Sequence, residues 1–129
     1  MTQGTVIREA HFPGRAPIDA YGNGGFRFAE MSHRGSLLCL PSGIYGWNVA
    51  SFDDLTINAF ERVFAECDDL EVLLVGTGDN LVPLPQRLHE KLRAASISAD
   101  PMSTGAAVRT FNVLLAERRA VGAALIAVD

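Results

Sequence analysis

Three predominantly apolar runs, separated by segments with helical periodicity, constrain the fold of this chain more than any other feature. The runs cover residues 36–40, 70–75 and 121–128. None of them alternates polar and apolar residues along its length, so each has the pattern of a strand covered on both faces. Strands of this kind that alternate with amphipathic helices predict an α/β fold, with a mostly parallel or mixed sheet and helices packed against it.

Three segments repeat apolar residues every three or four positions and are predicted to be helices. The first covers residues 51–67, with Ser51 as its N-cap and Asp54 three residues later as a near capping box. The second covers residues 85–95 and begins with a proline, which the first turn of a helix accepts. The third covers residues 103–119 and ends on two arginines, which complement the negative end of the helix dipole.

A β-hairpin is predicted before the first apolar run. Residues 18–21 and 26–30 form two short extended segments on either side of Gly22-Asn23-Gly24-Gly25. The Asn-Gly pair supplies the positive φ angles that a tight hairpin turn requires. The expected order is therefore hairpin, strand, helix, strand, helix, short strand, helix, strand.

The rest of the chain has weaker signals. Residues 1–17 are the least regular part, and residues 32–35 are expected to form a turn. Residues 41–51 contain one proline, two glycines and the only tryptophan, and they are expected to form a loop. Residues 97–99 are expected to form a short strand at the edge of the sheet.

Length and charge narrow the class of protein. The 129 residues, 48% of them hydrophobic, suit one soluble domain covering residues 1–129. The net charge of −4 argues against a nucleic-acid partner. No apolar stretch approaches the roughly 18 residues of a membrane span, and the N-terminus lacks the pattern of a signal peptide. Cys39 and Cys67 stand in apolar surroundings and are expected to be reduced, buried thiols, as in a cytoplasmic protein.

One candidate ligand site follows the second apolar run. Gly76, Thr77, Gly78 and Asp79 come directly after this strand, where open α/β sheets usually bind ligands. Free backbone N–H groups in such a loop hold an anion well. The glycines are equally compatible with a plain structural turn, because neither a dinucleotide-binding nor a P-loop pattern is present.

The third helix supplies two further residues to this candidate site. Thr104 lies in its first turn, among residues small enough for close backbone approach, so this turn is predicted to lie near Gly76–Asp79. Arg109 is predicted to face the gap between them, where its guanidinium would hold a carboxylate or phosphate. The alternatives are an ion pair with an internal acid such as Asp79, or a solvated side chain.

Other polar and aromatic residues carry weaker hypotheses. Tyr45 and Trp47 are candidate anchors for a protein partner, although a loop folded back over the sheet explains them equally well. His11, His33 and His89 show no metal-ligand spacing, and neither a metal nor a cofactor is expected. The residues assemble no recognisable catalytic set, so the chain is interpreted as non-enzymatic.

Three motifs in this order and spacing resemble one known family. They are Arg34-Gly35-Ser36 leading through Pro41-Ser42-Gly43 to Trp47, then Gly76-Thr77-Gly78 after its strand, then Met102 to Asn112 followed by Ala123-Ala124-Leu125-Ile126. The set is similar to a small α/β domain family of unknown function. Its mitochondrial members include an assembly factor for respiratory complex I, the NADH:ubiquinone oxidoreductase, and another member is an adipogenesis-associated vertebrate protein. This chain looks like the bacterial, free-standing form.

The resemblance has implications for fold and function. It implies a three-layer α/β domain with a mixed central sheet and a protruding N-terminal β-hairpin. It also implies an interaction module with protein partners such as respiratory-chain subunits or their assembly proteins, and it leaves room for a weak homo-oligomer. Such a protein is expected in the cytoplasm, peripheral to the inner membrane where partners hold it there. The alternative is a small-molecule binder or enzyme that uses the Gly76–Asp79 loop and Arg109.

Overall fold

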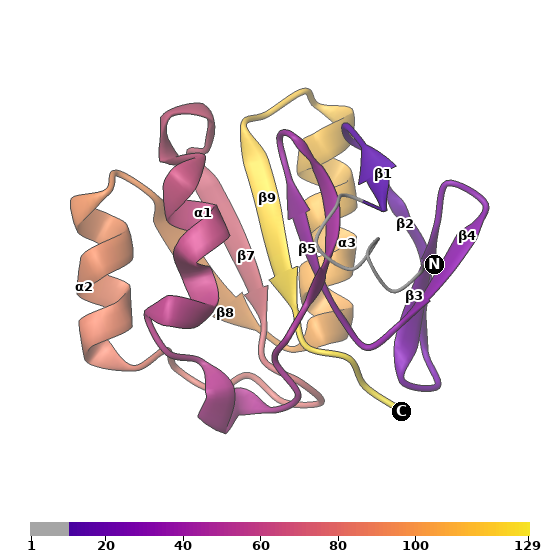
Figure 1. Ribbon diagram of the computed structural model, residues 1–129, viewed down its shortest axis with the longest axis horizontal. Coiled ribbons are helices and arrows are strands. Elements are labelled where there is room, and N and C mark those ends of the chain that lie inside the picture. Colours follow the sequence, from indigo (N-terminus) through magenta and orange to yellow (C-terminus); the bar gives the residue numbers. More distant parts are fainter. Residues whose placement is uncertain (1–10) are drawn as a thin grey trace, which may run out of the picture.

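A computed structural model describes residues 11–129 of the chain, and a six-stranded mixed sheet forms its centre (Figure 1). The strand order is β1-β6-β5-β9-β7-β8. These strands are β1 (Phe12–Pro13), β5 (Ser36–Leu40), β6 (Gly43–Trp47), β7 (Val72–Gly76), β8 (Ser98–Met102) and β9 (Val121–Leu125). β5 is antiparallel to both β6 and β9, whereas β9, β7 and β8 are mutually parallel.

The three apolar runs form three adjacent strands inside the sheet, as predicted. β5, β9 and β7 are adjacent in the sheet, and every residue of β5 and β9 is buried. Successive residues of β5 point to opposite faces, so Leu38 and Leu40 enter one half of the core while Leu37 and Cys39 enter the other. This two-sided burial is the reason why these strands lack polar alternation.

Helices cover both faces of the sheet and complete the predicted three layers (Figure 1). On one face lie α1 (Glu61–Ala65) and α2 (Gln86–Ala94), which contribute Val63, Leu88 and Leu92 to the core. On the other face lies α3 (Thr104–Ala116), which contributes Ala107, Val108 and Phe111. The side chain of Ser103 caps α3 by accepting the Ala106 N–H at 3.3 Å.

The predicted hairpin belongs to a second, three-stranded sheet beside α3. It contains β2 (Ile18–Gly22), β3 (Gly25–Phe28) and β4 (Met31–Arg34). Asn23 and Gly24 form its tight turn with φ angles of 53° and 80°. Phe26 and Phe28 are buried against the α3 side of the core, and this packing fixes the hairpin to the rest of the fold.

Two predicted irregular segments are strands instead. Residues 32–35, expected to be a turn, lie mostly in β4, and residues 41–51, expected to be a loop, contain β6. β6 pairs residue for residue with β5, from Ser36 opposite Trp47 to Leu40 opposite Gly43. Two glycines lower the strand propensity of β6, so only its pairing with the buried β5 defines it as a strand. The short β1 likewise lies within the segment described as least regular.

The first predicted helix is not continuous. Residues 52–54, 58–60 and 67–69 form separate 3₁₀ turns around the five-residue α1. The Asp54 carboxylate does accept the N–H groups of Ala50 and Ser51, at 3.0 and 3.3 Å, as the capping prediction requires. The Thr56 hydroxyl then accepts the Ala59 N–H at 3.3 Å and begins a new turn inside the segment. Apolar periodicity survives this break because the short turns still direct their apolar residues to the core.

The predicted cysteine environments are half right. Cys39 is 2% exposed, and burial raises the pKa of its thiol. Cys67 is only half-buried, because it stands in the 3₁₀ turn that follows α1. Both are free thiols. Within residues 11–129, no helix combines the length and the apolar character needed to span a bilayer.

Replacing Leu73 with Asp should unfold the protein, because Leu73 is fully buried at the centre of β7. An unpaired buried carboxylate costs several kcal/mol, against a total stability of about 5–15 kcal/mol. Thermal unfolding followed by circular dichroism measures this effect. Leu81→Asp is the matched control, since Leu81 is 58% exposed and should tolerate the same substitution. A melting temperature of Leu73→Asp close to that of the control would contradict this placement.

Candidate functional site

The Gly76–Asp79 loop and the first turn of α3 lie against each other, as predicted. The Thr104 N–H donates to the Gly78 carbonyl at 2.8 Å, and the Gly78 N–H donates to the Thr104 hydroxyl oxygen at 3.1 Å. A Cβ atom at Gly76 would lie 2.9 Å from the Thr104 Cα, so only glycine permits this approach. The two segments are therefore in direct contact, with no space between them for a ligand at this point.

The Thr77 and Gly78 groups of this loop, and the Thr104 hydroxyl beside it, already have hydrogen-bond partners. The Thr104 hydroxyl, which is fully buried, donates to the Ile126 carbonyl at 2.7 Å, and the Thr77 N–H donates to the Met102 carbonyl at 2.9 Å. The Thr77 hydroxyl donates to the Asn80 carbonyl and accepts the Val82 N–H. An anion would have to displace these bonds. The contacts favour the structural interpretation of the loop over the anion-binding one.

Arg109 lies on the hairpin side of α3. Its side chain is exposed and forms no ion pair with the exposed Asp79 or with any other residue between 11 and 129. A Cβ atom added at Gly105, one helical turn earlier, would overlap the Tyr21 hydroxyl and lie 3.5 Å from Arg109 Nη1. The guanidinium therefore stands beside the Tyr21 phenol over Gly105. The alternatives for Arg109 were anion binding, an ion pair with an internal acid and a solvated side chain, and this geometry agrees with the solvated side chain.

Tyr45 and Trp47 are buried in β6 and are not exposed anchors. The Trp47 Nε1–H donates to the Ala59 carbonyl at 2.8 Å, and its ring meets the Phe60 ring edge-on at 5.4 Å. The Tyr45 hydroxyl forms a short hydrogen bond with the Ser42 hydroxyl, and the Arg62 guanidinium lies 4.0 Å above the Tyr45 ring. These contacts correspond to the alternative interpretation, in which the segment covers the sheet.

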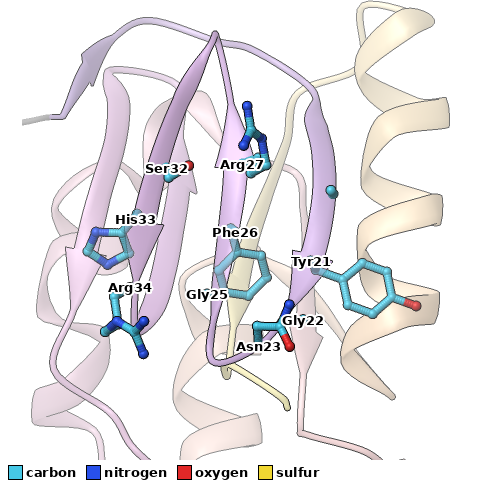
Figure 2. A pocket seen from close by; sticks show the side chains of 10 residues that line it. Tyr21, Gly22, Asn23, Gly25, Phe26, Arg27, Ser32, His33 and Arg34 are labelled. Atoms are coloured by element: carbon cyan, nitrogen blue, oxygen red, sulfur yellow. The ribbon is translucent and has the colours of Figure 1, made fainter.

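A cleft that the sequence did not indicate lies on the three-stranded sheet, with a volume of about 390 Å³ (Figure 2). Its floor is made of small residues: Ala20, Gly22, Gly25 and Ser32. Arg27 and Arg34, both exposed, stand at opposite ends of it (Figure 2). The floor leaves the two guanidinium groups accessible, which suits a ligand that carries negative charge.

The strand register explains why the two arginines share this cleft. Arg27 pairs with Ser32 and Arg34 pairs with Gly25, so both side chains project from the same face as diagonal neighbours. Neither arginine forms an ion pair with another residue in the described part of the chain. Diagonal neighbours lie about 7–8 Å apart, so one anion between these two long side chains can contact both guanidinium groups. The only sequence signal was the alternation around Arg27, and it carried no information about the partner strand.

His33 borders this cleft and forms a pair with His11. The two ring centroids lie 4.8 Å apart, and His33 Nε2 lies 3.1 Å from the Ser36 carbonyl oxygen, to which it donates in the matching tautomer. A Cβ atom at Gly46 would lie 3.0 Å from the His33 ring, so this glycine makes room for the pair. Burial lowers the pKa of His33, and the nearby His11 lowers it further, while the bond to Ser36 opposes both effects.

The remaining histidine lies on α2, apart from this pair. Among residues 11–129, no group of three or more His, Cys, Asp or Glu side chains is arranged to hold a metal ion.

Comparison with known sequences identifies relatives of this chain. The family described as "Protein of unknown function (DUF498/DUF598)" matches residues 18–126. An uncharacterized protein from Rhodobacter capsulatus is 43% identical over 92% of this chain and 90% of its own length. Proteins from Mus musculus and Homo sapiens named NADH dehydrogenase (ubiquinone) 1 alpha subcomplex assembly factor 3 are 32% and 34% identical over 93% and 84% of this chain. The chain spans only 65% and 59% of their lengths.

Solved structures agree with the described fold. A crystal structure described as an outer membrane protein from Bartonella henselae superposes with a TM-score of 0.89 and 63% identity, over 92% of this chain and 100% of that one. An Mth938-like domain from Bordetella pertussis superposes with a TM-score of 0.77 and 27% identity, over 87% and 85%. The fold is that of an Mth938-like domain, and the family resemblance seen in the sequence motifs is confirmed.

Replacing Thr104 with Val should lower the free energy of unfolding by about 2–6 kcal/mol. The variant keeps the shape of the side chain but leaves the Gly78 N–H and the Ile126 carbonyl without their partner, at about 1–3 kcal/mol for each unpaired group. Denaturant unfolding measures the change. Thr110→Val on the same helix is the control, because Thr110 is only half-buried. Equal losses for the two variants would show that the Thr104 hydroxyl does not join these elements.

Lowering the pH should destabilise the fold through His33. Above its usual pKa of 6.5 the ring is neutral in both the folded and the unfolded chain. Below 6.5 the unfolded chain binds a proton that the folded chain resists, so stability falls until the pH passes the lowered pKa of the folded state. His33→Gln should reduce this loss, whereas His89→Gln on the exposed face of α2 should retain it. Melting temperatures across this range test the claim, and an unchanged pH profile in His33→Gln would refute it.

Proposed function

The chain belongs to the DUF498/DUF598 family of proteins of unknown function, and we propose that it is a non-catalytic interaction module that assists the assembly of respiratory complex I. Relatives named as assembly factors of NADH dehydrogenase support this role, because their similarity extends over 84–93% of this chain. An assembly factor works by holding partner proteins, so its function requires an accessible recognition surface. In this proposal the protein acts in the cytoplasm and reaches the inner membrane through its partners.

The arginine-bordered cleft of the hairpin sheet is the observation that carries the proposal. Arg27 and Arg34 are exposed on one face of a sheet, and neither has an acidic partner among residues 11–129. The protein as a whole has a net charge of −4, so a cleft with two arginines is a local reversal of its surface charge. The partner that fits is a protein segment with acidic side chains, since guanidinium groups bind carboxylates with directional hydrogen bonds.

The geometry of the cleft also favours an extended segment of the partner. The small residues of its floor come from all three strands, so no bulky side chain blocks an extended chain that crosses the sheet there. Rim charges of this kind act mainly on partner choice and association rate. The other candidate function, binding of a small anion at Gly76–Asp79, Thr104 and Arg109, is the weaker proposal because the N–H groups of Thr77 and Gly78 already donate to Met102 and Thr104.

Affinity purification from the native host tests the proposal. The double variant Arg27→Gln with Arg34→Gln should capture about tenfold less of the respiratory-chain partner, because each lost charge-assisted contact is worth about 1 kcal/mol or more. Arg87→Gln with Arg93→Gln is the matched control, since both arginines are exposed on α2 and lie outside the cleft. Captured proteins are quantified by mass spectrometry against the wild type.

Three outcomes distinguish the parts of the proposal. Equal capture by the two double variants would remove the cleft as the recognition surface. Normal complex I content in a strain that lacks the protein, measured as NADH:ubiquinone activity of its membranes, would remove the assembly role. Stabilisation of the wild type by small dicarboxylates, with no respiratory protein captured, would favour a small-molecule binder instead.

A further inference from the structure

The outer face of α3 differs from that of α2 in a way that burial within one chain does not explain. Six of the seven exposed positions of α2 carry polar or charged side chains: Gln86, Arg87, His89, Glu90, Lys91 and Arg93. Arg109 is the only charged residue of the thirteen in α3. Val113, in the last turn of this helix, is 57% exposed, among half-buried alanine and threonine side chains. A solvated helix normally places polar side chains at such positions.

The exposed residues of this face have a symmetric charge pattern. Arg109, Val113 and Glu117 are all exposed and are spaced four residues apart, so they form one ridge along the helix surface. Val113 lies midway between the cation and the anion. If a second copy of this ridge packs in the antiparallel direction about Val113, each Arg109 faces the Glu117 of the other copy. A helix ridge of this spacing packed on another of the same kind is the commonest helix-packing class.

Two further features, a tyrosine ring and a cavity, lie on the side of α3 that faces the hairpin, and each can fit the other across a dimer interface. Tyr21 is 41% exposed, and its ring reaches from β2 toward α3 (Figure 2). Its hydroxyl lies over Gly105, eight residues before Val113, or about 12 Å along the helix. Near the other end of α3, a cavity of about 500 Å³ is lined on this same flank by Pro17, Leu115 and Arg118.

The hydrogen bonds of β2 show that the tyrosine and this cavity share one flank. The Asn112 side-chain amide bonds both the N–H and the carbonyl of Ile18 at 2.9 Å, which holds β2 along the helix. Arg15 donates to the Arg119 carbonyl at 2.8 Å, so the chain before β2 lies at the C-terminal end of α3. A two-fold axis through Val113, perpendicular to the helix, reverses the direction of α3 in the second copy and preserves the flank. The Tyr21 of each copy would then face the cavity of the other.

We propose that the outer face of α3 binds the same face of a second copy of this chain, in an antiparallel two-fold dimer centred on Val113. The interface is isologous, with an apolar centre, two symmetric Arg109–Glu117 pairs and the Tyr21 ring entering the cavity of the partner copy. An aromatic ring that fills a pocket beside arginines is a frequent anchor of protein interfaces. This inference does not depend on the proposed role in assembly.

The mass of the full chain in solution, measured by sedimentation equilibrium, tests the dimer. Wild-type protein should reach about twice 13.9 kDa as its concentration rises. Val113→Glu should weaken association by about tenfold or more, because it places two like charges on the two-fold axis. Ala94→Glu is the control, since Ala94 is exposed on α2 and should leave the dimer intact.

A charge exchange separates this arrangement from other dimers. Arg109→Glu alone and Glu117→Arg alone should each weaken association, because each places like charges opposite one another in both pairs. The double variant should restore it, since each pair then has its signs reversed. Wild-type protein that stays at 13.9 kDa up to about 1 mM would overturn the proposal. So would a double variant that associates no better than the single ones, or a Val113→Glu protein that dimerises as tightly as the wild type.

Discussion

The buried hydroxyl of Thr104 is the interaction on which the rest of this architecture depends. It accepts the Gly78 N–H after β7, donates to the Ile126 carbonyl after β9, and stands in the first turn of α3. One side chain thus joins the ends of two central strands to the helix that covers them. Gly76 allows this approach, because a Cβ atom there would lie 2.9 Å from the Thr104 Cα. The place where many α/β proteins bind a ligand is here used to connect the layers.

A second polar contact decides where the surfaces of the molecule lie. The Asn112 amide bonds the N–H and the carbonyl of Ile18, and so completes the edge of β2 as a neighbouring strand would. This bond, together with the burial of Phe26 and Phe28, fixes the three-stranded sheet beside α3. As a result, one face of the hairpin presents Arg27 and Arg34 to solvent, while Tyr21 extends the outer face of α3. The position of the three-stranded sheet beside α3 therefore creates two separate surfaces, the cleft with the two arginines and the outer face of α3.

Local sequence patterns correctly predicted the strands and helices whose burial or capping those patterns reflect directly. β5, β7 and β9 lack polar alternation because both of their faces are buried, and α3 begins at Ser103 because that side chain caps its first turn. β4 and β6 were not predicted, because β4 is short and mostly polar, and two glycines interrupt the strand-favouring residues of β6. Gly46 is an example. It makes room for the rings of His11 and His33, and this spatial requirement cannot be seen from the neighbouring residues in the sequence.

The sequence by itself determined the α/β class, the three adjacent strands β5, β9 and β7, two of the three helices and the family, because each rests on the periodicity or order of neighbouring residues. Only the tertiary structure decided which of the candidate residues are available for binding. Tyr45 and Trp47 are buried because β6 pairs with β5, and the Gly76–Asp79 loop is closed because Thr104 fills it. Arg27 and Arg34 share a cleft because β3 and β4 pair in one register. Whether a residue is accessible to a ligand or partner depends on which chain segments pack against it, and those segments are far apart in the sequence.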